Sequence, residues 1–163
     1  MPVLPALPST RLLIAALCLA GLPLAAAAPA AADALADCQW TRNDPEAVVK
    51  GCTLLIEERA APEAWMHFNR GLALKVLGRL EEAEQDYTRA IERNPRYAAA
   101  YTNRGNVRAL RNDLAGALAD YRKALSLDRT DRVARQNLKA IEKALRRIGA
   151  DKSGKGVTSG PTR

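Results

Sequence analysis

The chain has 163 residues, a formal net charge of +7 and three cysteines, and this length suits a single domain. Its only histidine, His67, and the lack of a C-x-x-C pair exclude the usual structural metal sites. The sequence has no Ser/His/Asp set, no glycine-rich phosphate loop and no nucleic-acid-recognition motif, so it predicts no enzyme, no cofactor and no nucleic-acid ligand. Its basic excess indicates acidic partners or simple solubility.

Residues 1–32 are typical of a secretory signal peptide. Arg11 is the only charge ahead of an almost wholly apolar run over residues 12–24, which is short for a membrane span. Ala30 and Ala32 satisfy the small-residue rule of signal peptidase, so we expect cleavage between Ala32 and Asp33. The mature protein is then exported, periplasmic or secreted, without a transmembrane span. The alternative is that the segment stays uncleaved as an N-terminal anchor.

Two cysteines, Cys38 and Cys52, remain after this cleavage. An even pair in an exported chain predicts a disulfide bond. The closed loop of about 14 residues would contribute about 3 kcal/mol of stability in the chain-entropy model. The alternative is a pair of reduced, structural thiols.

Helical periodicity dominates from Pro45 onward, and no strand-like alternation is sustained. Asp44 and Pro45 are a typical helix start, and Gly78 a typical helix end through positive φ. Asp131, or Thr130 before it, is expected to cap the last helix. The predicted helices span residues 45–59, 62–77, 80–93, 97–110, 114–127 and 132–148.

The segments outside these helices are predicted to be less regular. Residues 33–43 are expected to form a short ordered or semi-ordered lead held by Cys38. Residues 149–163 contain almost nothing apolar and are expected to be a disordered tail, because they cannot bury enough surface to offset their ordering entropy.

Two segments repeat along the chain without a gap. Residues 64–97 align with residues 98–131, an offset of 34 (98 − 64). Asn69-Arg70-Gly71 falls on Asn103-Arg104-Gly105, and Asp86-Tyr87 falls on Asp120-Tyr121. A fixed period of this length predicts stacked helical units and favours a binding scaffold over a catalyst.

The repeated residues resemble the tetratricopeptide repeat family. Its pattern has a large residue and then a small one in the first helix, and an alanine, an aromatic residue and another alanine in the second. The first unit has His67, Gly71, Ala83, Tyr87, Ala90 and a closing Pro95, and the second has Tyr101, Gly105, Ala117, Tyr121 and Ala124. His67 replaces an aromatic residue, and Arg129 stands in place of the second closing proline.

This resemblance implies an all-α fold, a short right-handed α-solenoid over residues 33–148. Val48, Cys52 and Leu55 repeat the spacing of the second-helix residues, so residues 45–59 are expected to form a half-repeat before the full repeats 64–97 and 98–131. Residues 132–148 resemble the helix that caps such arrays with a polar outer face. The layout is similar to that of small secreted tetratricopeptide-repeat proteins of Gram-negative bacteria.

The family's first helices line a concave groove, which is the expected peptide site. Its expected lining is Trp65, Phe68, Leu72 and Val76, then Ala99, Thr102, Asn106 and Leu110, continued by Val133, Gln136 and Ala140. The alternative is that Trp65 and Phe68 are core residues.

Family members that grip C-terminal carboxylates use lysine, arginine and asparagine at fixed groove positions. This chain matches at Asn103 alone, and Phe68, Leu72, Val133 and Asn137 occupy the other positions. The departure argues against such a carboxylate clamp.

Charged residues also recur between the units. Arg70 is expected to form an ion pair with Asp86, and Arg104 with Asp120, and these pairs would brace the helices against each other. The alternative is a row of arginines that binds anions. Glu81, Glu82, Glu84 and Asp86 make the first unit acidic, whereas Arg108, Arg111, Arg122 and Lys123 precede a basic end helix that carries Arg146 and Arg147.

The sequence thus favours an exported scaffold that binds another protein through its groove. The alternative is an envelope-associated protein that binds an anionic polymer or lipid headgroup through its basic C-terminal end. A third hypothesis is a self-assembling adaptor.

Overall fold

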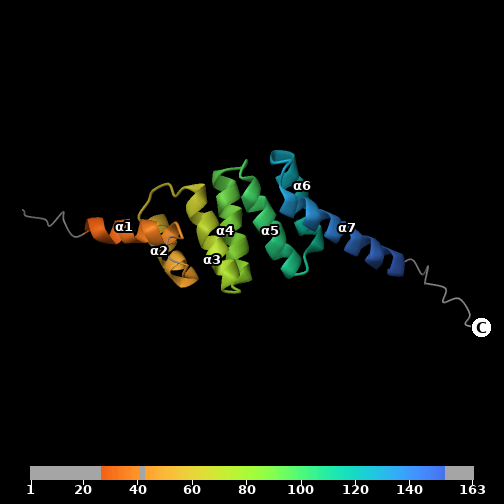
Figure 1. Ribbon diagram of the computed structural model, residues 1–163, viewed down its shortest axis with the longest axis horizontal. Coiled ribbons are helices and arrows are strands. Elements are labelled where there is room, and N and C mark those ends of the chain that lie inside the picture. The colour runs from red at the N-terminus through yellow and green to blue at the C-terminus, as the bar shows by residue number, and fades with distance from the viewer. Residues whose placement is uncertain (1–26, 41–42, 153–163) are drawn as a thin grey trace, which may run out of the picture.

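The computed structural model describes residues 27–40 and 43–152, and all regular structure in these ranges is helical. The helices are α1 (Ala27–Cys38), α2 (Pro45–Glu57), α3 (Ala64–Val76), α4 (Leu80–Arg93), α5 (Ala98–Leu110), α6 (Leu114–Leu127) and α7 (Arg132–Lys152). They follow one another along the long axis, with α1 at one end and α7 at the other (Figure 1). The expected all-α solenoid is confirmed. Within the described ranges, no helix has the length and apolar character needed to span a bilayer.

Local signals in the sequence account for most helix ends. The Asp44 carboxylate accepts hydrogen bonds from the backbone N–H groups of Glu46 and Ala47, at 3.0 and 3.3 Å. Gly78 ends α3 with a φ of 75°, as expected. Asp131, and not Thr130, caps α7, because its carboxylate accepts from the backbone N–H of Ala134 at 2.9 Å. The bounds of α4 and α6 agree with the predicted ones.

Other helix bounds differ from the expected ones by a few residues. Pro62 precedes α3, whose N-cap is Glu63, and α2 ends at Glu57. At the other end, α7 continues to Lys152, so residues 149–152 are helical, which corrects the expected start of the disordered tail. Gly149 costs a helix only about 1 kcal/mol, and extending an existing helix needs no new nucleus. The remaining tail residues, and the predicted signal up to residue 26, lie outside the described residues.

The N-terminal end is a complete helical hairpin. Helix α1 covers residues 33–38 of the expected ordered or semi-ordered lead, together with residues 27–32 of the predicted signal peptide. It pairs with α2, so the expected half-repeat has a partner helix. A disulfide bond joins Cys38 to Cys52, and both cysteines are fully buried. Gly51 allows the close approach, because a Cβ there would lie 2.6 Å from the carbonyl oxygen of Ala34. Helix α1 has little apolar periodicity, because Ala34 and Cys38 are its only buried residues among those whose side chains are described, and it was therefore not predicted.

In each repeat unit, a glycine on the first helix contacts a tyrosine ring on the second helix. A Cβ on Gly71 would lie 2.9 Å from Tyr87 Cε1, and a Cβ on Gly105 would lie 2.8 Å from the same atom of Tyr121. Both tyrosine rings are buried, at 0% and 1% exposure. The rings therefore pack directly on the first helix of their own unit, which sets the distance between the two helices of that unit.

Candidate functional site

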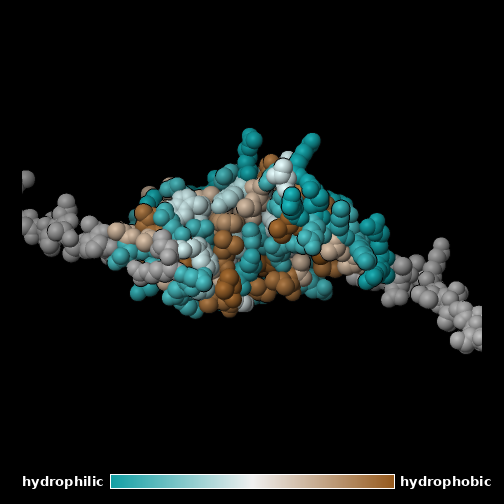
Figure 2. All heavy atoms as spheres, in the orientation of Figure 1, coloured by the Kyte–Doolittle hydropathy of each residue, from teal (hydrophilic) through white to brown (hydrophobic). Residues whose placement is uncertain are grey.

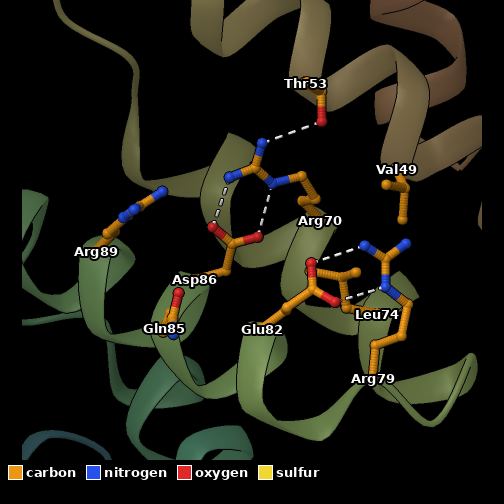
Figure 3. A pocket seen from close by; sticks show the side chains of 9 residues that line it. All are labelled: Val49, Thr53, Arg70, Leu74, Arg79, Glu82, Gln85, Asp86 and Arg89. Atoms are coloured by element: carbon orange, nitrogen blue, oxygen red, sulfur yellow. Dashed lines mark hydrogen bonds and ion pairs between the residues drawn. The ribbon is translucent and has the colours of Figure 1, made fainter.

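An ion pair braces the first repeat unit. The guanidinium of Arg70 on α3 donates to both carboxylate oxygens of Asp86 on α4, at 2.7 and 2.8 Å, and to the hydroxyl of Thr53 on α2 at 3.0 Å (Figure 3). Burial alone would raise the pKa of Asp86, but the hydrogen bonds from Arg70 and His67 outweigh it and lower that pKa. The expected brace is present, and it also connects the unit to the preceding hairpin.

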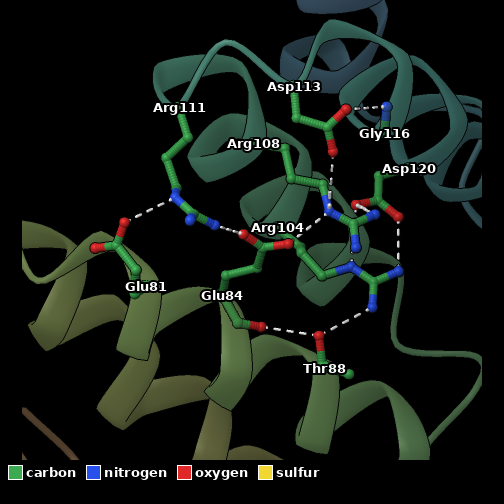
Figure 4. A network of polar contacts seen from close by, with 9 residues as sticks. All are labelled: Glu81, Glu84, Thr88, Arg104, Arg108, Arg111, Asp113, Gly116 and Asp120. Atoms are coloured by element: carbon green, nitrogen blue, oxygen red, sulfur yellow. Dashed lines mark hydrogen bonds and ion pairs between the residues drawn. The ribbon is translucent and has the colours of Figure 1, made fainter.

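The second unit repeats this brace and extends it. Arg104 donates to Asp120 at 3.0 and 2.8 Å and to the hydroxyl of Thr88 at 3.1 Å. Asp120 also accepts from Arg108 at 2.9 Å. The network continues across the units, because Glu84 on α4 binds both Arg108 of α5 and Arg111, which directly follows α5 (Figure 4).

The repeated arginines are consequently engaged by carboxylates of the same chain. Asp86 and Asp120 are almost fully buried, with side chains 3% and 4% exposed. Burial would raise the pKa of Glu84, but hydrogen bonds from Arg108 and Arg111 outweigh it and lower that pKa. This geometry supports a structural role for Arg70 and Arg104 and leaves no arginine row for anions.

A mostly apolar hollow opens between α5 and α7. It has a volume of about 400 Å³. Its lining residues are Asn106, Ala109 and Leu110 of α5, Tyr121 of α6, and Asn137, Ala140 and Ile141 of α7. Three of these, Asn106, Leu110 and Ala140, are among the predicted groove residues.

Polar side chains meet at the floor of this hollow. The Oδ1 atom of Asn106 accepts from the Tyr121 hydroxyl at 2.8 Å and from Nδ2 of Asn137 at 2.7 Å. Burial raises the pKa of Tyr121, so its hydroxyl stays a neutral donor well above neutral pH. The contacts hold the two amides in one orientation at the base of an apolar wall.

Large apolar side chains are exposed to solvent on α3, α5 and α7. Val76 is 64% exposed, Leu110 is 67% exposed and Val133 is 52% exposed. Val76 and Leu110 occupy equivalent positions in the two units. Figure 2 shows hydrophobic surface in a band over the middle of the molecule that continues along its lower edge toward α5. Of the other expected lining residues, Ala99, Gln136 and Ala140 are exposed, and Leu72 and Asn106 are half-buried.

Thr102 does not line the groove, which corrects its expected position. It is 4% exposed, and its hydroxyl donates to the Asp131 carboxylate at 2.6 Å. Asp131 is the residue that caps α7, so Thr102 lies beneath the turn that leads into that helix. The 34-residue offset makes Thr102 equivalent to Phe68 and Asp131 equivalent to Tyr97, so the contact is a hydrogen bond here and a ring contact in the first unit.

Trp65 and Phe68 each serve partly as core. The ring centroid of Phe68 lies 5.8 Å from that of Tyr87 and 4.8 Å from that of Tyr97. Trp65 packs on the cluster between the first hairpin and α3, and its indole N–H donates to Glu63 at 3.1 Å. Both side chains are half-buried, so each contributes to the core and also to the edge of the groove.

Lys75 lies beside the expected groove residues and was not predicted from the sequence. Its ammonium group donates to Oδ1 of Asn103 at 2.9 Å, and burial lowers its pKa. Asn103 is the single residue that matches a carboxylate clamp, and its Nδ2 donates to the carbonyl oxygen of Ala99. Tyr121, Ala109 and Ile141 were also not expected in the site. For Ile141, the i, i+4 spacing from Asn137 was the available signal.

Comparison with known proteins identifies the repeats. Residues 64–97 and 98–131 each match the family model of the tetratricopeptide repeat. RNA polymerase II-associated protein 3 of Xenopus tropicalis is 40% identical over 83 residues, which are 51% of this chain and 13% of that protein. The chain thus spans a small part of this relative. The relative is a frog protein, so similarity to small secreted bacterial proteins stays a prediction.

Solved structures show the same fold. The first TPR of Spaghetti (RPAP3), bound to the HSP90 peptide SRMEEVD, superposes with a TM-score of 0.64 and 26% identity, over 71% of this chain and 94% of that chain. The second TPR domain of human RPAP3, in complex with the HSP70 peptide SGPTIEEVD, gives a TM-score of 0.63 and 26% identity, over 71% and 97%.

Proposed function

We propose that this protein, whose residues 64–131 form two tetratricopeptide repeats, is a scaffold that binds another protein through the concave groove of α3, α5 and α7. The observation that carries the proposal is the exposure of Val76, Leu110 and Val133 on these three helices. Exposed large apolar side chains that recur at equivalent positions of the two units, as Val76 and Leu110 do, favour an interaction surface. The solved structures with bound peptides support the same use of the fold.

The groove is held in place by contacts that a ligand does not need to form. The Arg70–Asp86 and Arg104–Asp120 pairs fix each unit, and the Asn106–Tyr121–Asn137 contacts fix α5, α6 and α7 together. A preformed surface loses little conformational entropy on binding, so moderate apolar contact is enough for affinity. The proposed mechanism is non-covalent docking.

A photocrosslinking amino acid placed at Leu110 tests this proposal. Leu110 and Leu54 are both exposed leucines, but Leu54 lies on α2, away from the groove. We expect an adduct with a discrete partner from the Leu110 position in the native host, and no such adduct from Leu54. Equal labelling at the two positions would contradict a groove-specific interaction.

We also propose that the protein is exported after cleavage between Ala32 and Asp33. The cut falls inside α1, and the residues of this helix that pack on α2, Ala34 and Cys38, come after it. The disulfide between Cys38 and Cys52 suits an oxidising compartment. Mass spectrometry of the mature chain should give Asp33 as its first residue and no free thiol. An intact N-terminus would support the anchor alternative.

A basic surface on α7 favours a second candidate function. Lys139, Lys143, Arg146 and Arg147 are exposed, and none of them pairs with an acidic side chain among the described residues. Such a surface attracts an anionic polymer or lipid headgroup. Binding to vesicles with anionic lipid should then fall steeply with salt and with the change of Arg146 and Arg147 to glutamine. Binding that is insensitive to salt would exclude it.

A further inference from the structure

We propose that the groove selects an uncharged peptide segment and anchors one of its large apolar side chains in the hollow between α5 and α7. This inference rests on the proposed scaffold function and names the chemistry of its partner. The proposed peptide differs from the acidic peptides SRMEEVD and SGPTIEEVD, which are bound in two of the similar solved structures.

The first argument is the charge of the hollow. The residues that line it on α5, α6 and α7 include no acidic or basic side chain. The nearby Lys75 donates from its ammonium group to Asn103. A carboxylate brought into the hollow would lose hydration without a cationic partner among the lining residues, which is unfavourable.

The second argument is where the arginines are used. Arg70, Arg104, Arg108 and Arg111 all bind carboxylates of α4 or α6. Redirecting one of them to a ligand would leave a buried or half-buried carboxylate, such as Asp120, without its partner. These four arginines are therefore not available to an acidic peptide.

The third argument is the shape and chemistry of the hollow. Leu110, Ala109, Ala140 and Ile141 form apolar walls, which suit an apolar side chain. At the floor, Oδ1 of Asn106 already accepts two hydrogen bonds. Nδ2 of Asn106 and Oδ1 of Asn137 have no partner among the described residues, so they remain as one donor and one acceptor. A neutral peptide bond offers the complementary acceptor and donor.

A display selection with random dodecapeptides tests the inference on the full mature chain. Peptides retained by the wild type are counter-selected against Leu110→Glu, which changes a side chain that is 67% exposed and so should leave the fold intact. We expect enrichment of peptides with a large apolar residue and depletion of aspartate and glutamate. A synthetic peptide from the selection should bind about tenfold more tightly than SRMEEVD, with less than about a twofold change in Kd between low and high salt.

Two control variants separate the outcomes. Ala140→Glu, at an exposed residue that lines the hollow, should weaken the selected peptide, whereas Leu54→Glu on α2 should not. Enrichment of acidic peptides that is lost in Leu110→Glu overturns the inference but keeps the groove as the binding site. Absence of any enrichment that depends on Leu110 overturns the proposed function itself.

Discussion

Tyr87 and Tyr121 occupy equivalent positions in successive units, but their hydroxyl groups meet different surroundings. The hydroxyl of Tyr121 donates to Asn106 at 2.8 Å, whereas the buried hydroxyl of Tyr87 has no hydrogen-bond partner among the described residues. Burial raises the pKa of both tyrosines. The same residue type therefore contributes packing in the first unit, and packing together with a polar contact in the second.

Replacing each tyrosine by phenylalanine should separate these contributions. Tyr121→Phe should lower the free energy of unfolding by about 1 kcal/mol, because a half-buried hydrogen bond is lost. Tyr87→Phe should leave it unchanged or raise it, because an unpaired buried hydroxyl is removed. Denaturant unfolding of the two variants measures the difference, and each variant is the control for the other. Equal losses would contradict the unpaired state of Tyr87.

Asp86 should make stability depend on acidic pH. Its folded-state pKa is lowered from an unfolded value of about 3.9, so the carboxylate stabilises the fold at neutral pH. This contribution is complete above the unfolded pKa and is lost as the pH falls through the folded pKa. Unfolding measured from neutral pH to about pH 2 should therefore show a steeper loss for the wild type than for Asp86→Asn.

Glu82 offers the matched control for Asp86. It also pairs with an arginine, Arg79, at 2.7 Å, but both side chains are exposed. Solvent screens such pairs, so Glu82→Gln should keep the acid profile of the wild type. If the Glu82 and Asp86 variants behave alike, the acid sensitivity does not come from the buried brace.

At the scale of the helical hairpins, the first one is held together by a different device from the other two. The second and third hairpins each use a glycine–tyrosine contact and an arginine–aspartate pair. In α2, an offset of 35 (87 − 52) places Cys52 at the position of Tyr87 and Gly51 at that of Asp86. One covalent bond and a close backbone approach thus replace the aromatic ring and the brace.

Removing this bond should loosen one hairpin and leave the others intact. The double variant Cys38→Ala/Cys52→Ala should lose about 3 kcal/mol of stability in the chain-entropy model. Hydrogen exchange should show lost protection in α1 and α2, with α5 to α7 unchanged, because solenoid units contact only their neighbours. Uniform loss of protection along all helices would contradict this division.

At the scale of the whole molecule, the apolar core is divided into successive clusters along the solenoid axis. One lies between the first hairpin and α3, one between the two repeat units, and one around α5 to α7. Cooperative unfolding then depends on contacts between units. Glu84 supplies such contacts, because it joins α4 to Arg108 of α5 and to Arg111, which directly follows α5.

Glu84→Gln should reduce the cooperativity of unfolding. Weaker coupling lets the units unfold in separate steps, so the apparent m-value in urea should fall. Glu92→Gln is the control, since Glu92 is an exposed residue on α4 without an ion pair among the described residues. An unchanged m-value with a lower midpoint would show that Glu84 contributes stability but no coupling between units.

The sequence by itself determined the features that depend on neighbours within one helix or one repeat. Helical periodicity predicted the bounds of α4 and α6, because side chains three and four positions apart share a face, and Asp113 caps α6. The 34-residue offset predicted the braces of Arg70 and Arg104, since equivalent positions in stacked units face equivalent neighbours. The presence of two cysteines after the expected cleavage site predicted the disulfide bond of the first hairpin.

Only the tertiary structure decided what the ends of the array look like and where the hollow forms. Thr102 is buried because α7 begins above it, and Asn106 meets Asn137 across 31 residues of sequence. Helix α1 exists through its packing on α2, with little periodic signal of its own. These features depend on which side chains meet between neighbouring helices, and equivalent positions of a repeat can carry different side chains, as Phe68 and Thr102 do.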